Sequence, residues 1–174
     1  MALEKKKIFD IEIPLMGQSI QALSTVKENL NGKIIKLDLT RVLKGRNIDS
    51  TLLVSMKDGK LVADFTGLKV VPSYIRRMMR KNISWIEDSF ICPTKDAKVE
   101  VKPFMITKKR VHRSVRKELR NNAKEIIVKF AADKTAEQVF DATIRGTLQK
   151  DISAGLKKIY PLAFCEIRIL KLKK

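Results

Sequence analysis

Residues 98–131 read KVEVKPFMIT followed by KKRVHRSVRKELRNNAKEIIVKFA, and the hydrophobic pattern changes where these two parts meet. The first ten residues have the apolar and β-branched composition of a strand. From about Lys109 to Ala131 the apolar residues recur at helical spacing, which predicts a basic helix roughly 30 Å long. The chain therefore combines strands with at least one long helix.

The residues before this point are mostly predicted strands. Alternation of apolar and polar residues marks them, and Asp58-Gly59 between two apolar runs is a hairpin signal because glycine tolerates positive φ. One short helix, Ser73–Asn82, interrupts the strands, and residues 15–31 are predicted as turns with at most a short helix near Thr25–Leu30. The strands predicted over the whole chain are Lys7–Ile13, Gly32–Leu43, Thr51–Met56, Lys60–Leu68, Ile83–Cys92, Lys98–Thr107 and Ala163–Leu172.

The last third of the chain is predicted to be helical. Thr135 and Gln138 have the spacing of a capping box, and the helix that they begin runs on, with a break at Gly146, until just before Pro161. The order of strands, short helix, strands, helices and final strand is that of an α+β protein. A length of 174 residues suits a single domain over residues 1–174, or two small lobes that share a core. Strands dominate residues 1–107 and helices dominate residues 108–174.

The charge of the chain predicts a polyanionic partner. There are 37 lysines and arginines against 19 acidic residues, for a formal net charge of +18. A domain of this kind needs a net charge of only about 2–8 to stay soluble. Nucleic acid is favoured over a membrane surface, which would need a strongly apolar helix face opposite the basic one. Because no apolar run is long enough for a membrane span or a signal peptide, we expect a cytoplasmic protein that does not bind a membrane.

The residue types that enzymes need are scarce. His112 is the only histidine and lies among cations, so it is interpreted as one more polar contact. Cys92 and Cys165 lack metal-binding spacing and are interpreted as buried, reduced thiols. Glycine-rich phosphate-binding motifs are absent. We therefore expect no enzyme activity, no catalytic residue, no cofactor and no metal site.

Two stretches concentrate the positive charge. Residues 69–81 carry five basic residues and no acid, and residues 102–120 carry eight basic residues and one acid, Glu118. Because like charges four residues apart destabilise a helix, this crowding predicts a phosphate-facing surface, and arginine matches phosphate oxygens in a bidentate manner. With one Trp and two Tyr, an aromatic platform for bases is not indicated, and recognition of RNA shape and backbone is favoured. Further basic blocks predict several separate phosphate surfaces: Lys5-Lys6-Lys7, Lys33/Lys36, Arg41/Lys44/Arg46 and the C-terminal Lys171, Lys173 and Lys174.

Four segments carry a family resemblance in the right order along nearly the whole chain. They are LNGKIIKLDLTRVL (30–43), FTGLKVVPSYIRRMMRKNISWIEDSF (65–90), TKDAKVEVKPFMITKKRVHRSVRKELR (94–120) and IYPLAFCEIRILKL (159–172). Together they resemble the small-subunit ribosomal protein family S-three-A-e, also called S-one-e, of archaea and eukaryotes. The family's Thr-Lys-Asp is commonly followed by Gly-Tyr, whereas Ala97-Lys98 follows here. The chain also lacks the long C-terminal extension of many eukaryotic members, which favours an archaeal source or a reduced eukaryotic one.

The resemblance implies a structural constituent of the small ribosomal subunit, bound to ribosomal RNA on the platform near the mRNA exit side. Neighbouring small-subunit proteins, and messenger RNA near the exit, are the further partners that it implies. It also implies a β-rich, barrel-like antiparallel core with basic amphipathic helices packed on it. The alternative is a free-standing RNA-binding assembly or translation factor. The residues to which the resemblance carries RNA contact are Arg76, Arg77, Arg80, Lys81, Lys108, Lys109, Arg110, Arg113, Arg116, Lys117 and Arg120.

Overall fold

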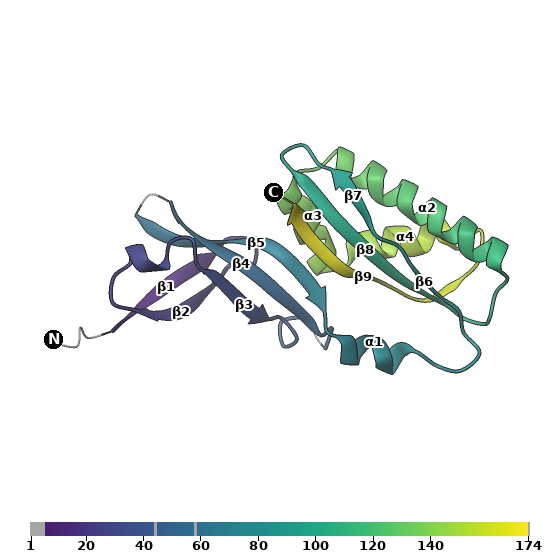
Figure 1. The fold of residues 1–174 in the computed structure, drawn as a ribbon, viewed down its shortest axis with the longest axis horizontal. Helices are drawn as coiled ribbons and strands as arrows, with labels where there is room; N and C mark the ends of the chain where they lie inside the picture. The colour runs from purple at the N-terminus through teal and green to yellow at the C-terminus, as the bar shows by residue number, and fades with distance from the viewer. Residues whose placement is uncertain (1–5, 44, 58, 174) are drawn as a thin grey trace. The chain divides into compact units, whose positions relative to one another are not determined.

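The structure is a computed structural model that describes residues 6–43, 45–57 and 59–173 (Figure 1). Its contacts divide the chain into two compact units. Unit 1 takes residues 1–37 and 50–66, and unit 2 takes residues 38–49 and 67–174. Among the described residues, no helix is both long enough and apolar enough to cross a membrane.

Unit 1 is built from strands and one short 3-10 turn. They are β1 (Lys7–Ile13), β2 (Gln18–Ser24), η1 (Glu28–Leu30), β3 (Ile34–Asp38) and the unit 1 parts of β4 (Ile48–Lys57) and β5 (Lys60–Val70). β1 pairs antiparallel with β2 and parallel with β5, and β4 pairs with both β3 and β5. The predicted strand over residues 7–13 is confirmed, because Ile11 and Ile13 are buried and Asp10 and Glu12 are exposed. The predicted β4–β5 hairpin is also confirmed, although Asp58 lies outside the described residues.

Two predictions in unit 1 need correction. Residues 15–31, predicted as turns, contain β2, which pairs with β1 along its whole length. The sequence QSIQALS has few β-branched residues, so its composition does not indicate a strand. β2 is the last strand in the sheet order and is held by backbone pairing with β1. The strand predicted over Gly32–Leu43 ends at Asp38. It ends there because the Asp38 carboxylate accepts hydrogen bonds from the backbone N–H and the hydroxyl of Thr40, which turns the chain.

Unit 2 contains a sheet with β8 (Lys98–Thr107) in the middle. β9 (Leu162–Lys173) pairs antiparallel with β8, and the end of β5 pairs with β9. The other edge of β8 pairs with β6 (Trp85–Glu87) and β7 (Phe90–Pro93). The single strand predicted over Ile83–Cys92 is therefore two strands. Asp88 and Ser89 interrupt it, where the Asp88 carboxylate accepts a hydrogen bond from the Ser89 N–H at 2.9 Å.

Four helices are described, all in unit 2. They are α1 (Pro72–Met78), α2 (Arg113–Ala132), α3 (Ala136–Arg145) and α4 (Thr147–Leu156), and Figure 1 shows α2 running beside β7. The predicted capping box is confirmed: the Gln138 N–H donates to Thr135 Oγ1 and the Thr135 N–H donates to Gln138 Oε1. The predicted break at Gly146 is confirmed as well. Gly146 has a φ of 79°, which favours glycine, and it separates α3 from α4.

The α+β class with a β-rich core is confirmed, but the sheet is not a closed barrel. The described strands run in the order β2-β1-β5-β9-β8-β6, and the end strands β2 and β6 do not pair with each other. The pairing of β1 with β5 is parallel, so the sheet is mixed rather than antiparallel. In unit 2 the sheet and helices bury a common core that includes Phe104, Met105, Ile106, Leu119, Ile127, Phe140, Leu148 and Ile152.

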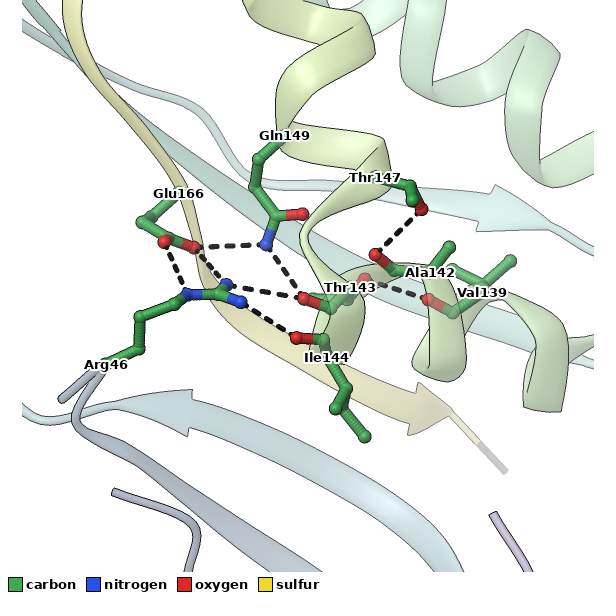
Figure 2. Close-up of polar contacts among 8 residues, drawn as sticks. All are labelled: Arg46, Val139, Ala142, Thr143, Ile144, Thr147, Gln149 and Glu166. Carbon is green, nitrogen blue, oxygen red and sulfur yellow. Dashed lines mark hydrogen bonds and ion pairs between the residues drawn. The ribbon is translucent and has the colours of Figure 1, made fainter. Parts of the chain in front are cut away.

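A half-buried arginine joins residues 38–49 to the rest of unit 2 (Figure 2). Arg46 forms an ion pair with Glu166 of β9 at 2.8 Å and donates to the carbonyl oxygens of Thr143 and Ile144 at the end of α3. Gln149 of α4 donates to Thr143 O and to Glu166 Oε2, each at 3.0 Å. The last carbonyl groups of a helix lack hydrogen-bond donors within the helix, and here the guanidinium group of Arg46 donates to two of them. Arg46, predicted as part of a phosphate-facing block, therefore has a structural role.

Candidate nucleic-acid interface

The positive charge of the chain is concentrated in unit 2. Unit 1 has eight lysines, no arginine and six acidic residues, for a net charge of +2, which leaves +16 of the total +18 for unit 2. All eleven arginines belong to unit 2. The eleven cations predicted to contact RNA also lie in unit 2, and every one of them is exposed. The candidate interface is therefore a feature of unit 2.

The first group of predicted cations, Arg76, Arg77, Arg80 and Lys81, is called segment A here. Pro72 begins α1. Ile75 is buried, and the ring centroid of Tyr74 lies 5.8 Å from that of Phe164. These two residues hold the helix against the rest of unit 2. Arg77 lies 5.5 Å from the centre of the Tyr74 ring and donates to Asn47 Oδ1 at 3.1 Å. These contacts limit the positions that the Arg77 side chain can take.

The helix predicted over Ser73–Asn82 is shorter than expected. It ends at Met78, because Met79 takes an extended conformation, and Asn82 has a left-handed φ of 60°. Arg80 and Lys81 therefore lie in the turn that follows α1 and leads into β6, not on the helix. The segment keeps its exposed charge, but only Arg76 and Arg77 are carried by a helix face.

The second group, Lys108, Lys109, Arg110, Arg113, Arg116, Lys117 and Arg120, is called segment B here. The helix predicted from Lys109 begins at Arg113, so the first three cations lie in the connection between β8 and α2. Arg113, Arg116, Lys117 and Arg120 are spaced at i, i+3, i+4 and i+7 and share one side of α2. Together with Asn121 these four cations line a shallow surface hollow.

A buried pair of hydroxyl residues joins segments A and B. Ser84 follows segment A, Thr107 precedes segment B, and both are nearly inaccessible to solvent. The Thr107 N–H donates to Ser84 O at 3.0 Å, and the Ser84 N–H donates to Thr107 Oγ1 at 3.1 Å. The Val111 N–H donates to Ser84 Oγ at 3.2 Å, which holds residues 107–111 in a non-helical course. The structure thus brings together two basic stretches that the sequence presents as separate.

The cations of segments A and B form no ion pairs among the described residues. Three other arginines in unit 2 do pair with carboxylates at 2.8–2.9 Å: Arg46 with Glu166, Arg145 with Asp141 and Arg168 with Glu87. The segments therefore present positive charge that the protein itself does not neutralise, which is what a phosphate-binding surface requires.

The groups that could support other chemistry do not converge. His112 is exposed at the start of α2, with Nδ1 3.3 Å from Ser114 Oγ. Cys92 is buried, Cys165 is half-buried, and both thiols are free. Burial raises the pKa of Cys92 to about 11 and that of Cys165 to about 12, so both stay protonated at neutral pH. Within the described ranges, no three His, Cys, Asp or Glu residues gather in a way that could hold a metal ion.

One residue of this surface has no counterpart in the predictions. Trp85 is 54% exposed on β6 and lines a second hollow, together with residues 82–84 and with Arg110, Val111 and Arg116. Arg116 lines both hollows, so they are neighbours. The sequence does place Trp85 close to the basic stretch 69–81. A strand predicted over Ile83–Cys92, however, does not show which face of the strand packs on the core and which is exposed.

The sequence of the chain is similar to those of several archaeal ribosomal proteins. Relatives named small ribosomal subunit protein eS1 include one from Methanothermobacter thermautotrophicus, 32% identical over 114 residues, which are 65% of this chain and 58% of the relative. The relative from Methanobrevibacter smithii is 33% identical over 59% of this chain and 54% of its own length. That from Saccharolobus islandicus is 28% identical over 79% of this chain and 74% of its own length.

The match to the first two relatives thus spans only a little over half of their length. The model of the Ribosomal S3Ae family, by contrast, matches residues 2–174. The chain belongs to the Ribosomal S3Ae family.

Proposed function

We propose that this chain is a structural constituent of the small ribosomal subunit and binds ribosomal RNA through segments A and B. Its family and the names of its relatives support the ribosomal role. Such a role is cytoplasmic, within the ribosome, and it requires neither a catalytic residue nor a cofactor. The relatives are ribosomal proteins, which is consistent with a protein that is not an enzyme.

The observation that carries the RNA-binding proposal is the joining of two unneutralised basic segments by the Ser84–Thr107 contact. Eleven exposed cations that have no carboxylate partner among the described residues would repel one another in a free protein. RNA phosphates remove that repulsion and release counterions, which favours binding. Arginine supplies seven of the eleven, and its planar fork binds two phosphate oxygens at once.

The position on the platform near the mRNA exit side, and messenger RNA as a partner there, come from the family resemblance. Neighbouring ribosomal proteins are proposed as partners of unit 1. Its net charge is only +2, and the cross-strand neighbours Ile8 and Leu23 are 62% and 65% exposed. Exposed apolar side chains on a nearly neutral surface fit a protein partner better than RNA.

A sucrose gradient of a cell lysate, probed for this protein before and after a high-salt wash, tests the ribosomal role. We expect the protein to remain with the small subunit after the wash, because contacts to several phosphates and to neighbouring proteins would hold it on the subunit. Protein that runs at the top of both gradients, as a free chain of 19.9 kDa, would contradict the proposal and favour a dissociable factor. Crosslinking of segments A and B to the RNA of the washed subunit would then identify the contact site and its place on the platform.

A further inference from the structure

The hollow beside Trp85 has a composition that backbone recognition alone does not need. Trp85 is the only Trp of the chain, and Ile86, the next residue on β6, is 1% exposed and points to the other side of the strand. The large ring of Trp85 thus remains half in solvent on the strand side opposite Ile86. Exposure of a large aromatic side chain in water is unfavourable and is typical of residues that bind a partner.

The faces of this ring are not used within the described part of the chain. Ring–ring contacts join Phe164 to Tyr74 and to Phe104, and cation–π contacts use the rings of Tyr74, Phe90 and Phe130. Trp85 takes part in none of these contacts, and its indole N–H has no hydrogen-bond partner among the described residues. A flat group of the right size could therefore stack on it without displacing a ring–ring, cation–π or hydrogen-bond contact of the described residues.

The rest of the hollow fits a nucleotide. Arg110 and Arg116 line it, none of its described lining residues is acidic, and Asn82 offers an amide that can both donate and accept hydrogen bonds. The volume is about 270 Å³, which lies below the roughly 300–1,000 Å³ of pockets for drug-sized ligands and suits one flat ring system. Since Arg116 also lines the hollow on α2, an RNA strand on segment B would pass directly beside Trp85.

We propose that Trp85 stacks on an unpaired RNA base in this hollow while Arg110 and Arg116 bind the adjacent phosphates. This inference rests on the proposed binding of RNA by segment B. A base inside a duplex is stacked on its neighbours and cannot reach the ring, so the occupant is a bulged or single-stranded nucleotide. This contact would add one stacked base to the backbone recognition that the sequence favours.

Because Trp85 is the only Trp, its fluorescence reports directly on this hollow in the full-length protein. The probes are a short RNA duplex with a single-nucleotide bulge and the same duplex without the bulge. We expect the bulged RNA to quench the fluorescence strongly and the regular duplex to change it little. The Trp85 variants have no Trp, so their affinity is measured by fluorescence anisotropy of labelled RNA. Because a base stacked on an aromatic ring favours binding, Trp85→Ala should weaken binding of the bulged RNA by about tenfold. Trp85→Phe should retain most of the affinity, because it keeps an aromatic face.

The controls separate this inference from the function on which it rests. Ile91→Ala removes another exposed apolar side chain, on β7, and should leave binding of both RNAs unchanged. If both duplexes bind alike and Trp85→Ala affects neither or both equally, the stacking proposal is wrong and RNA binding by segment B stands. If neither RNA binds, both proposals fail. If Trp85→Ala instead releases the protein from the subunit without changing binding of either duplex, the ring contacts a neighbouring protein.

Discussion

Arginine has two different roles in unit 2, and the neighbours of each side chain decide which. The side chain of Arg46 is 21% exposed, and that of its partner Glu166 is 10% exposed. Two nitrogens of the guanidinium group donate to the two carboxylate oxygens of Glu166. Arg113 and Arg116, by contrast, are exposed and have no carboxylate partner in the part of the chain that the structure describes. A buried charge is costly unless it is paired, whereas an exposed cation is already stabilised by water. The first kind of arginine stabilises the fold, and the second leaves its charge available to a phosphate.

This difference predicts that the Arg46–Glu166 pair matters for folding and the exposed pairs do not. Glu166→Gln keeps the shape of the side chain but removes the negative charge that faces Arg46. We expect the free energy of unfolding, measured by urea denaturation, to fall by about 2–4 kcal/mol, because an unpaired cation stays half-buried. The matched control is Glu87→Gln, whose partner Arg168 lies 2.9 Å away in an exposed pair, and it should cost less than about 1 kcal/mol. Equal losses in the two variants would contradict the assignment of Arg46 to the core.

At the level of elements, local signals were predictable and long-range ones were not. β1 and β8 have the predicted bounds, and the capping box at Thr135 forms as expected, because alternation and caps depend on neighbouring residues. β2 was missed because its pairing with β1, not its composition, makes it a strand. The eleven cations could be selected from their crowding in the sequence. The approach of the end of segment A to the start of segment B could not, since it depends on hydrogen bonds between Ser84 and Thr107, which are 23 residues apart.

We expect the hydrogen bonds between Ser84 and Thr107 to hold the end of segment A next to the start of segment B. Thr107→Val has almost the same shape but leaves the buried Ser84 N–H without its acceptor, which should cost about 1–3 kcal/mol of the free energy of unfolding. We also expect faster hydrogen exchange at the Ser84 amide in the folded protein, measured by NMR. Thr66→Val, which removes a half-buried hydroxyl donor to Thr51 O in unit 1, is the control and should leave exchange at Ser84 unchanged. Unchanged exchange at Ser84 in Thr107→Val would show that the two segments are held by other contacts.

Over the whole molecule, the basic blocks of the sequence lie in different surroundings. Lys33 and Lys36 belong to unit 1, where lysines and acidic residues nearly balance, and Arg46 is engaged by Glu166. Lys5, Lys44 and Lys174 lie outside the described residues, and Lys171 and Lys173 belong to β9. Lysine is also a strongly hydrated point charge that binds phosphate with less geometric specificity than arginine. These differences fit the proposal that unit 2 binds RNA and unit 1 contacts protein.

Two double variants with the same change of charge distinguish this arrangement from a diffuse attraction. Arg113→Ala/Lys117→Ala removes two cations of segment B, and Lys33→Ala/Lys36→Ala removes two cations of unit 1. Affinity for small-subunit RNA is measured by fluorescence anisotropy across a salt series from about 50 to 200 mM, where each phosphate contact contributes a slope of roughly 0.7–0.9. We expect the first variant to reduce the slope of log affinity against log salt by about 1–2 units, with an unchanged melting temperature, and the second to leave the slope as it is. If both variants reduce the slope equally, RNA responds to the total charge of the chain, and the assignment of binding to unit 2 is wrong.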